Sequence, residues 1–223
     1  MPMAMVACNQ TVPSAAAPRW RPRELLKGAA RLLALVVVSP LLLWHWLWTL
    51  LIGRDRALEG SSELLSLAPG LVGQYLRRAF LAWTLTECSP TAVIGFGVLF
   101  SKADARIGPN VYIGPRCHIG LAHIERDALL AAGVHVTSGA RTHGIDDSSR
   151  PIREQTGTVT PVRIGAGAWI GSAAVVMADV GRESVVGAGA VVAKPLPDAV
   201  IAVGVPARVV RSRGEAATPL ATE

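Results

Sequence analysis

Residues 162–194 read VRIGAGAWIGSAAVVMADVGRESVVGAGAVVAK, and within this stretch an aliphatic residue, often followed by glycine, returns near every sixth position. The aliphatic positions are Ile164, Ile170, Val176, Val186 and Val192. A period of six does not match the 3.6-residue period of an amphipathic helix. It predicts a three-sided solenoid, in which each hexad gives one short strand and one tight turn and the aliphatic side chain points inward.

The same rhythm continues upstream of this stretch. Its hexads begin at Ile94, Phe100, Ile107, Ile113, Ile119, Ile124, Leu130 and Val136. The register slips around Arg106, between Ile119 and Ile124, and again between Val176 and Val186, which requires bulges or altered turns. A polar loop, residues 142–161, separates the two blocks of repeats. Loops of this length in a compact domain are usually functional.

The N-terminal third contains a long apolar segment. Leu32 to Ile52 carries no formal charge and is about long enough to cross the roughly 30 Å of a bilayer core as a helix. Ser39-Pro40 interrupts the run, and basic residues flank both ends, which favours a re-entrant or interfacial helix over a simple span. A spanning helix and a helix buried under the solenoid remain the alternatives.

A second apolar pattern follows between Ser62 and Leu85 and breaks at Pro69-Gly70. It predicts two short amphipathic helices that lie on the bilayer, cap the first coil of the solenoid, or do both. The sequence therefore divides into a disordered basic tail at 1–22, membrane-associated helices at 23–86, the solenoid at 87–213 and a disordered tail at 214–223.

The composition narrows the class of protein. Charged residues make up 17% of the chain and hydrophobic residues 51%, so some apolar surface is expected to meet lipid or a partner subunit. The net charge of +6 is concentrated near the two ends of the chain, without the aromatic-interleaved basic surface typical of nucleic-acid binding. The three cysteines, Cys8, Cys88 and Cys117, show no paired spacing, which argues against a disulfide framework or a zinc site.

Three motifs carry a resemblance to a known family. Residues 162–172 (VRIGAGAWIGS), 186–194 (VGAGAVVAK) and 202–210 (AVGVPARVV) resemble the hexapeptide-repeat acyltransferases, the group of the galactoside, maltose and serine acetyltransferases. The resemblance runs from about Cys88 to Arg213. Residues 53–56 (GRDR) and 64–67 (LLSL) are similar to membrane-associated members, the exopolysaccharide O-acetyltransferases.

The resemblance implies a left-handed parallel β-helix and a homotrimer with clefts between neighbouring solenoids. It also implies acetyl-CoA as the co-substrate, no metal, and a histidine base on an extended loop. His143 best fills the position of that base. Imidazole suits the role because it titrates near neutral pH and can take the acceptor proton as attack develops.

The acceptor and the cofactor each receive candidate residues. His118 and His135 occupy equivalent places about one coil apart, and Asp146 lies in the loop beside His143, so these three are candidate acceptor contacts. For coenzyme A, the family pattern carries over onto Ser172, Ala188, Lys194, Arg208 and Arg211, with Trp169 as a further contact. Ala193 departs from the threonine often found before that lysine, which removes one hydrogen bond to the cofactor.

The expected function is therefore CoA-dependent acyl transfer, in particular O-acetylation, to a sugar hydroxyl or amine of a lipid-linked glycan at the cytoplasmic face of a bacterial inner membrane. One alternative is a non-catalytic, membrane-tethered β-helix scaffold. A second is a γ-class carbonic anhydrase, since His118 and His123 are five apart as in that solenoid. The third histidine that it needs is missing near Ala82.

Overall fold

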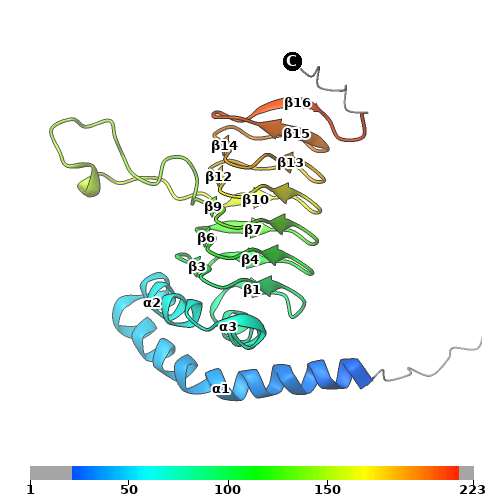
Figure 1. Cartoon of the computed structure of the whole chain (residues 1–223). Helices are drawn as coiled ribbons and strands as arrows, with labels where there is room; N and C mark the ends of the chain where they lie inside the picture. The colour runs from blue at the N-terminus through cyan, green and yellow to red at the C-terminus, as the bar shows by residue number, and fades with distance from the viewer. Residues whose placement is uncertain (1–21, 216–223) are drawn as a thin grey trace, which may run out of the picture.

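The computed structural model describes residues 22–215 and consists of a helical base below a β-solenoid (Figure 1). The base contains α1 (Pro22–Ile52), α2 (Arg54–Ser66) and α3 (Gly70–Thr84). Most of the two expected tails, 1–22 and 214–223, lies outside the described residues. Within them, Pro22 begins α1, and Gly214 and Glu215 follow the last strand.

The solenoid has three walls of short strands. Sheet A contains β1 (Glu87–Cys88), β4 (Arg106–Ile107), β7 (Ala122–Ile124) and β10 (Val162–Ile164). Sheet B contains β2 (Val93–Ile94), β5 (Tyr112–Ile113), β8 (Leu129–Leu130), β11 (Trp169–Ile170), β13 (Val185–Val186), β15 (Val200–Val203) and β16 (Arg208–Ser212). Sheet C contains β3 (Leu99–Phe100), β6 (His118–Ile119), β9 (His135–Val136), β12 (Val175–Val176) and β14 (Val191–Val192).

The coils stack in register through parallel pairing, and one buried aliphatic or aromatic residue per strand forms the core. On sheet B, for example, Ile94 pairs with Ile113, Ile113 with Leu130 and Leu130 with Ile170. These side chains are fully buried. The hexad rhythm therefore does set the inward positions, and the expected left-handed parallel β-helix is confirmed.

Glycines after the inward residue are required by the distance between coils. A Cβ on Gly165 would lie 2.5 Å from the amide nitrogen of Arg182, and one on Gly171 would lie 2.5 Å from that of Ala188. The corner itself bends two residues later, where Gly167 and Ala173 have φ of 67° and 57°. The glycine after the inward residue thus allows the coils to approach, and the residue two places later bends the corner.

The register slips concentrate at the corner between sheets C and A. Val180 and Leu196 fill sheet A positions there, bridged as Ile164↔Val180↔Leu196, only four residues after the preceding inward valine. A strict search at period six passes over both. His123, which the pattern places inward, instead points outward between buried Ala122 and Ile124 on β7.

Helices α2 and α3 cover the first coil. The buried Arg77 guanidinium donates to three backbone carbonyls, those of Ile94 in β2, Leu65 in α2 and Ala68 in the turn between the helices. Ser62 Oγ accepts from the amide of Phe100 in β3, and the Asp55 carboxylate accepts from the amide of Ala103 at 3.0 Å. The break at Pro69-Gly70 and the cap over the first coil both agree with the sequence.

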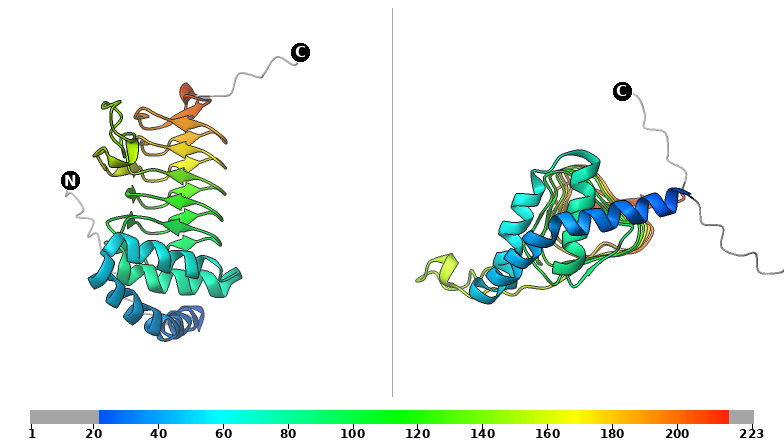
Figure 2. Two further views of the ribbon diagram at one scale, coloured as in Figure 1. Left: turned by 90° about the vertical axis from the view of Figure 1, so that its left-hand side faces the viewer. Right: turned by 90° about the horizontal axis from the view of Figure 1, so that it is seen from below.

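Helix α1 is continuous through Pro40 and bends along its length, lying across the lower end of the molecule (Figures 1 and 2). The interruption expected at Ser39-Pro40 is therefore a bend within one helix. Its buried residues, Ala34, Val38, Leu42 and His45, face α2 and α3. Most of its other apolar side chains are exposed, and the segment Leu25–Ile52 has the length and composition of a membrane-crossing helix.

Candidate functional site

The loop between β9 and β10 forms an arm that projects from the solenoid (Figure 1). Its stalk is a short antiparallel ladder, in which Thr160 donates to Ser138 O at 2.9 Å, Thr158 donates to Arg141 O at 2.7 Å, and His143 bridges Thr156. The His143 side chain is exposed, and among residues 22–215 it has no hydrogen-bond partner. The ladder thus holds the backbone of the candidate base while its imidazole stays accessible.

The head of the arm is closed by side-chain hydrogen bonds. Gln155 donates to Asp147 O at 2.6 Å and to Arg150 O at 3.0 Å, and its oxygen accepts from the Asp147 amide. Two hydrogen bonds from Ser149 hold the pKa of Asp147 below its usual value. Asp146, the candidate acceptor contact, is exposed next to this closed turn, while Asp147 has the structural role in the turn.

Sheet C carries the two histidines that the sequence places one coil apart. His118 and His135 pair across β6 and β9, and their ring centroids are 6.0 Å apart. Both rings are on the outer face, because their neighbours Ile119 and Val136 point into the core. The arm begins at the end of β9, one residue after Val136. The histidine pair therefore lies on the wall from which the arm departs.

Three of the candidate cofactor residues follow one corner of the solenoid. Ser172 and Ala188 are exposed on successive coils at the corner between sheets B and C, where the Gly189 amide donates to Ser172 O. A Cβ on Gly187 would meet the Val203 side chain of the next coil, and Val203 pairs with Arg208 on β16. The corner thus presents a line of small side chains, and the exposed Arg208 lies at the end of that line. This arrangement fits an extended ligand that has a phosphorylated end.

The remaining candidates lie elsewhere on the same copy. Lys194 is exposed at the corner between sheets C and A, across sheet C from Ser172. Trp169 is half exposed on the outer face of sheet B, in line with Tyr112 and Leu129. Arg211 bends toward the chain end and donates to Glu215 O at 2.5 Å. One copy of the chain therefore does not bring all the candidate residues together.

A cavity that the sequence did not indicate lies at the base of the arm. It has a volume of about 550 Å³, and its lining includes Arg141 and Thr160 from the stalk, Asp179 from the adjacent coil, and both neighbours of Lys194. It is the place where Lys194 comes near the arm. The sequence could have indicated Arg141, because it lies two residues before His143. The hexad pattern gave no indication of Asp179.

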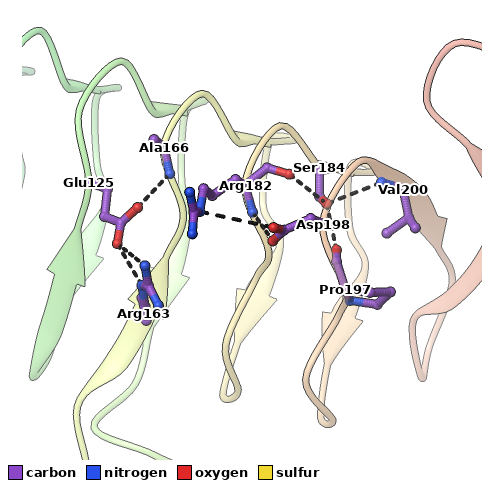
Figure 3. Close-up of polar contacts among 8 residues, drawn as sticks. All are labelled: Glu125, Arg163, Ala166, Arg182, Ser184, Pro197, Asp198 and Val200. Carbon is purple, nitrogen blue, oxygen red and sulfur yellow. Dashed lines mark hydrogen bonds and ion pairs between the residues drawn. The ribbon is translucent and has the colours of Figure 1, made fainter.

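Polar contacts along the corner between sheets A and B tie successive coils together (Figure 3). The Glu125 carboxylate accepts from Arg163 Nε at 2.6 Å and from the Ala166 amide at 3.0 Å. The Arg182 amide donates to Asp198 at 2.7 Å. Partial burial alone would raise the pKa of Glu125, but these hydrogen bonds outweigh it and hold the pKa below its usual value. This corner has a structural role.

Among the described residues, 22–215, no group of three histidine, cysteine, aspartate or glutamate side chains is placed to hold a metal ion. The site that they do form is a solvent-facing histidine on an arm, beside a solenoid wall with two further histidines and a corner of small residues. A fold and site of this kind define a solenoid acyltransferase.

Comparison with known proteins agrees. A family model described as the hexapeptide repeat of succinyl-transferase matches residues 105–138 and 161–194. The chain is 30% identical over 166 residues to galactoside O-acetyltransferase of Escherichia coli, covering 64% of this chain and 80% of that enzyme. The chain therefore belongs to the hexapeptide-repeat acyltransferases, and the expected enzyme class is confirmed.

A shorter match and two solved structures complete the comparison. A protein of Mycobacterium tuberculosis named as a probable acetyltransferase is 45% identical over 73 residues, which cover 32% of this chain and only 24% of that protein. Maltose O-acetyltransferase from Clostridium difficile superposes with a TM-score of 0.64 at 21% identity, over 74% of this chain and 89% of that one. A galactoside acetyltransferase in complex with coenzyme A gives 0.55 at 22%, over 71% and 80%. At these identities the structures show a shared fold.

Proposed function

We propose that this protein is an acetyl-CoA-dependent acyltransferase, in particular an O-acetyltransferase that acts on a sugar hydroxyl of a lipid-linked glycan, with a sugar amine as the alternative acceptor. The observation that carries the proposal is the accessible His143 on an ordered arm at the boundary between coils. Galactoside O-acetyltransferase of Escherichia coli, of which this chain covers 80%, is named for a sugar acceptor. The acceptor hydroxyl would give its proton to a ring nitrogen of His143 as it attacks.

The corner between sheets B and C fits acetyl-CoA, which supplies the acyl group as a reactive thioester. Ser172 and Ala188 are small and exposed, so an extended chain can approach the backbone along them. Arg208 lies at the end of this line, where a phosphate would form charge-assisted hydrogen bonds. Lys194, Arg211 and Trp169 would add contacts from other walls, which requires more than one copy of the chain.

A homotrimer would complete such a site. The arm exposes Ile145 by 73% and Ile152 by 57%, and it projects from its own solenoid. Sheet B exposes an aligned apolar stripe, Tyr112, Leu129 and Trp169. If the arm of one copy reaches sheet B of a neighbouring copy, the apolar side chains of the arm can pack against the apolar stripe of that sheet. His118, His135 and Asp146 would then face the acceptor in the cleft.

The helical base supports a membrane location, which we place at the cytoplasmic face of the bacterial inner membrane, where acetyl-CoA is made. Helix α1 lies across the end of the solenoid (Figure 2). It exposes Trp44 and Trp46 together with most of its leucines. This arrangement favours an interfacial helix over a span, because the buried stripe of α1 is needed for packing on α2 and α3.

Release of free CoA from acetyl-CoA tests the proposal. The full-length protein is incubated with acetyl-CoA and either simple sugars or membrane glycolipids, and thiol release is followed with mass spectrometry of the products. We expect release that depends on the acceptor, with a gain of one acetyl group per hydroxyl or amine modified. A scaffold would release no thiol with any acceptor. Acetylation of simple sugars but never of glycolipids would remove the glycan part of the proposal.

A further inference from the structure

Two arginines share the junction between α1 and α3 without a counter-ion. Arg31 on α1 and Arg78 on α3 line the same small cavity, together with Trp83. Among residues 22–215, neither guanidinium takes part in a salt bridge, and Arg31 Nε is buried without a hydrogen-bond partner. Both side chains are partly buried, and a cation that is partly removed from water is stabilised by a counter-ion, so this junction has a free capacity for an anion.

An apolar groove lies on the other side of Tyr75. The Arg78 guanidinium carbon is 4.6 Å from the centre of the Tyr75 ring, and Tyr75 also lines a cavity of about 400 Å³ between α1 and α3. The lining of this groove is otherwise mainly apolar: Leu33, Val37, Leu71, Val72 and Leu76. Four of these side chains are at least half exposed, so the groove opens on the surface of the helical base.

We propose that this junction binds one anionic phospholipid, with its phosphate between Arg31 and Arg78 and an acyl chain in the groove. A free phosphate would use the arginines and leave the groove empty, and an apolar helix would fill the groove and leave the arginines unpaired. Only an amphipathic ligand with one negative head and one apolar chain matches both halves. Arginine forms short, charge-assisted hydrogen bonds to phosphate oxygens, which suits the head.

The position of the junction fits this ligand. Helix α1 presents exposed leucines, valines and tryptophans along the same end of the molecule, where a bilayer would supply the lipid. Anionic lipids attract basic residues close to the membrane surface. The inference deepens the proposed membrane location and does not depend on acyl transfer, so its failure would leave the thiol-release test unaffected.

Thermal unfolding of the full-length protein in neutral detergent micelles tests the site. Phosphatidylglycerol, phosphatidylcholine and inorganic phosphate are added separately at equal phosphate concentration. We expect phosphatidylglycerol to raise the unfolding temperature in a saturable way, and the other two to leave it unchanged. Equal stabilisation by phosphatidylcholine would overturn the role of the arginines. Equal stabilisation by inorganic phosphate would overturn the role of the groove.

Two variants separate the halves of the site. Arg31→Gln/Arg78→Gln is expected to weaken phosphatidylglycerol binding by about tenfold or more, since hydrogen bonds to charged groups are lost. Without lipid this variant should be at least as stable as the wild type, because two neighbouring like charges are removed. The control variant Arg54→Gln/Arg56→Gln removes the same amount of charge from the start of α2, just after the C-terminal end of α1. It should leave phosphatidylglycerol binding unchanged. A binding loss as large in this control would show a diffuse charge effect and overturn the site.

The groove has its own variant. Val72 is 70% exposed, so Val72→Trp fills the groove without disturbing the core. We expect it to abolish the stabilisation by phosphatidylglycerol while the lipid-free unfolding temperature stays the same. Wild-type lipid binding in this variant would exclude the groove as the place of the acyl chain.

Discussion

His118 and His135 lie directly one above the other on sheet C, with their ring centroids 6.0 Å apart and the rings inclined at 62°. Because both are on an outer face beside the arm, they are placed to donate hydrogen bonds to a polar acceptor. We expect His135→Gln to raise KM for the acceptor roughly tenfold, about the value of one hydrogen bond, and to leave KM for acetyl-CoA unchanged. Steady-state kinetics with each substrate varied would measure this. A fall in unfolding temperature with both KM values unchanged would instead indicate packing.

Replacement of the candidate base should reduce turnover. We expect His143→Ala to lower kcat by roughly 10² to 10⁴-fold, the usual contribution of a general base. Thiol release at saturating acetyl-CoA gives the rate, and His123→Ala on sheet A is the matched control that should keep it. Equal rates for His143→Ala and the wild type would remove His143 from its role.

The stalk of the arm depends on one close backbone approach. A Cβ on Gly157 would lie 2.2 Å from Thr142 O, so Gly157→Ala must separate the two strands beside His143. We expect turnover to fall at least about tenfold while the unfolding temperature changes little, since Gly157 lies on the projecting arm and no residue of the stretch 139–161 belongs to the buried hydrophobic core. Gly60→Ala in α2, where a Cβ meets nothing within 4 Å, should keep activity. A large fall in unfolding temperature for Gly157→Ala would show that the arm stabilises the solenoid.

Arg77 joins the helical base to the solenoid. It is 2% exposed, and its loss would remove a donor from three carbonyls, on α2, the turn and β2, of which only Leu65 O would keep another donor, the Ala68 amide. We expect Arg77→Met to lower the free energy of unfolding by about 3 kcal/mol or more, measured by denaturant titration. Arg77→Lys should recover only part of this, because an ammonium group does not reach three carbonyls in a planar fork. Full recovery by lysine would mean that charge alone matters.

Glu125 should make stability depend on pH on the acid side. Its pKa is held below the usual value in the folded protein, so its hydrogen bonds to Arg163 and the Ala166 amide stabilise the fold above the unfolded-state pKa. This contribution is lost as pH falls through the lower, folded-state pKa. Unfolding temperatures between pH 7 and pH 3 should therefore fall less steeply for Glu125→Gln than for the wild type. Parallel curves would contradict the prediction.

The six-residue period was enough to predict the solenoid because each wall needs one inward residue per strand, whatever its outer residues are. It failed at Val180 and Leu196 because the corner between sheets C and A uses a shorter turn, and a fixed period has no signal for turn length. Pro40 was expected to divide α1. The helix instead continues, since Val38 and Leu42 on either side pack on the same neighbours and the missing amide is accommodated by a bend.

The candidate site was predictable only in part. The loop follows from the interruption of the repeats, and the choice of His143 as the candidate base follows from the family resemblance. The cavity at the base of the arm could not be predicted. Its lining brings together Arg141, Asp179 and the two neighbours of Lys194, which depends on how the stalk folds back on the coils. The stalk has no repeat pattern that would predict this. The contacts that the arm would make with a second copy in the proposed homotrimer are also not encoded in any one period of the sequence.

The first turn of the solenoid is covered and the last turn is covered in part, and this limits how copies of the chain could associate. A parallel stack of coils normally presents unpaired amides and carbonyls at its first and last turn, which can recruit strands from other molecules. Here α2 and α3 cover the first turn, and β16 runs antiparallel to β15 along part of the last. End-to-end growth into fibres would be blocked at the first turn and hindered at the last, which leaves the sides of the column for the homotrimer proposed above.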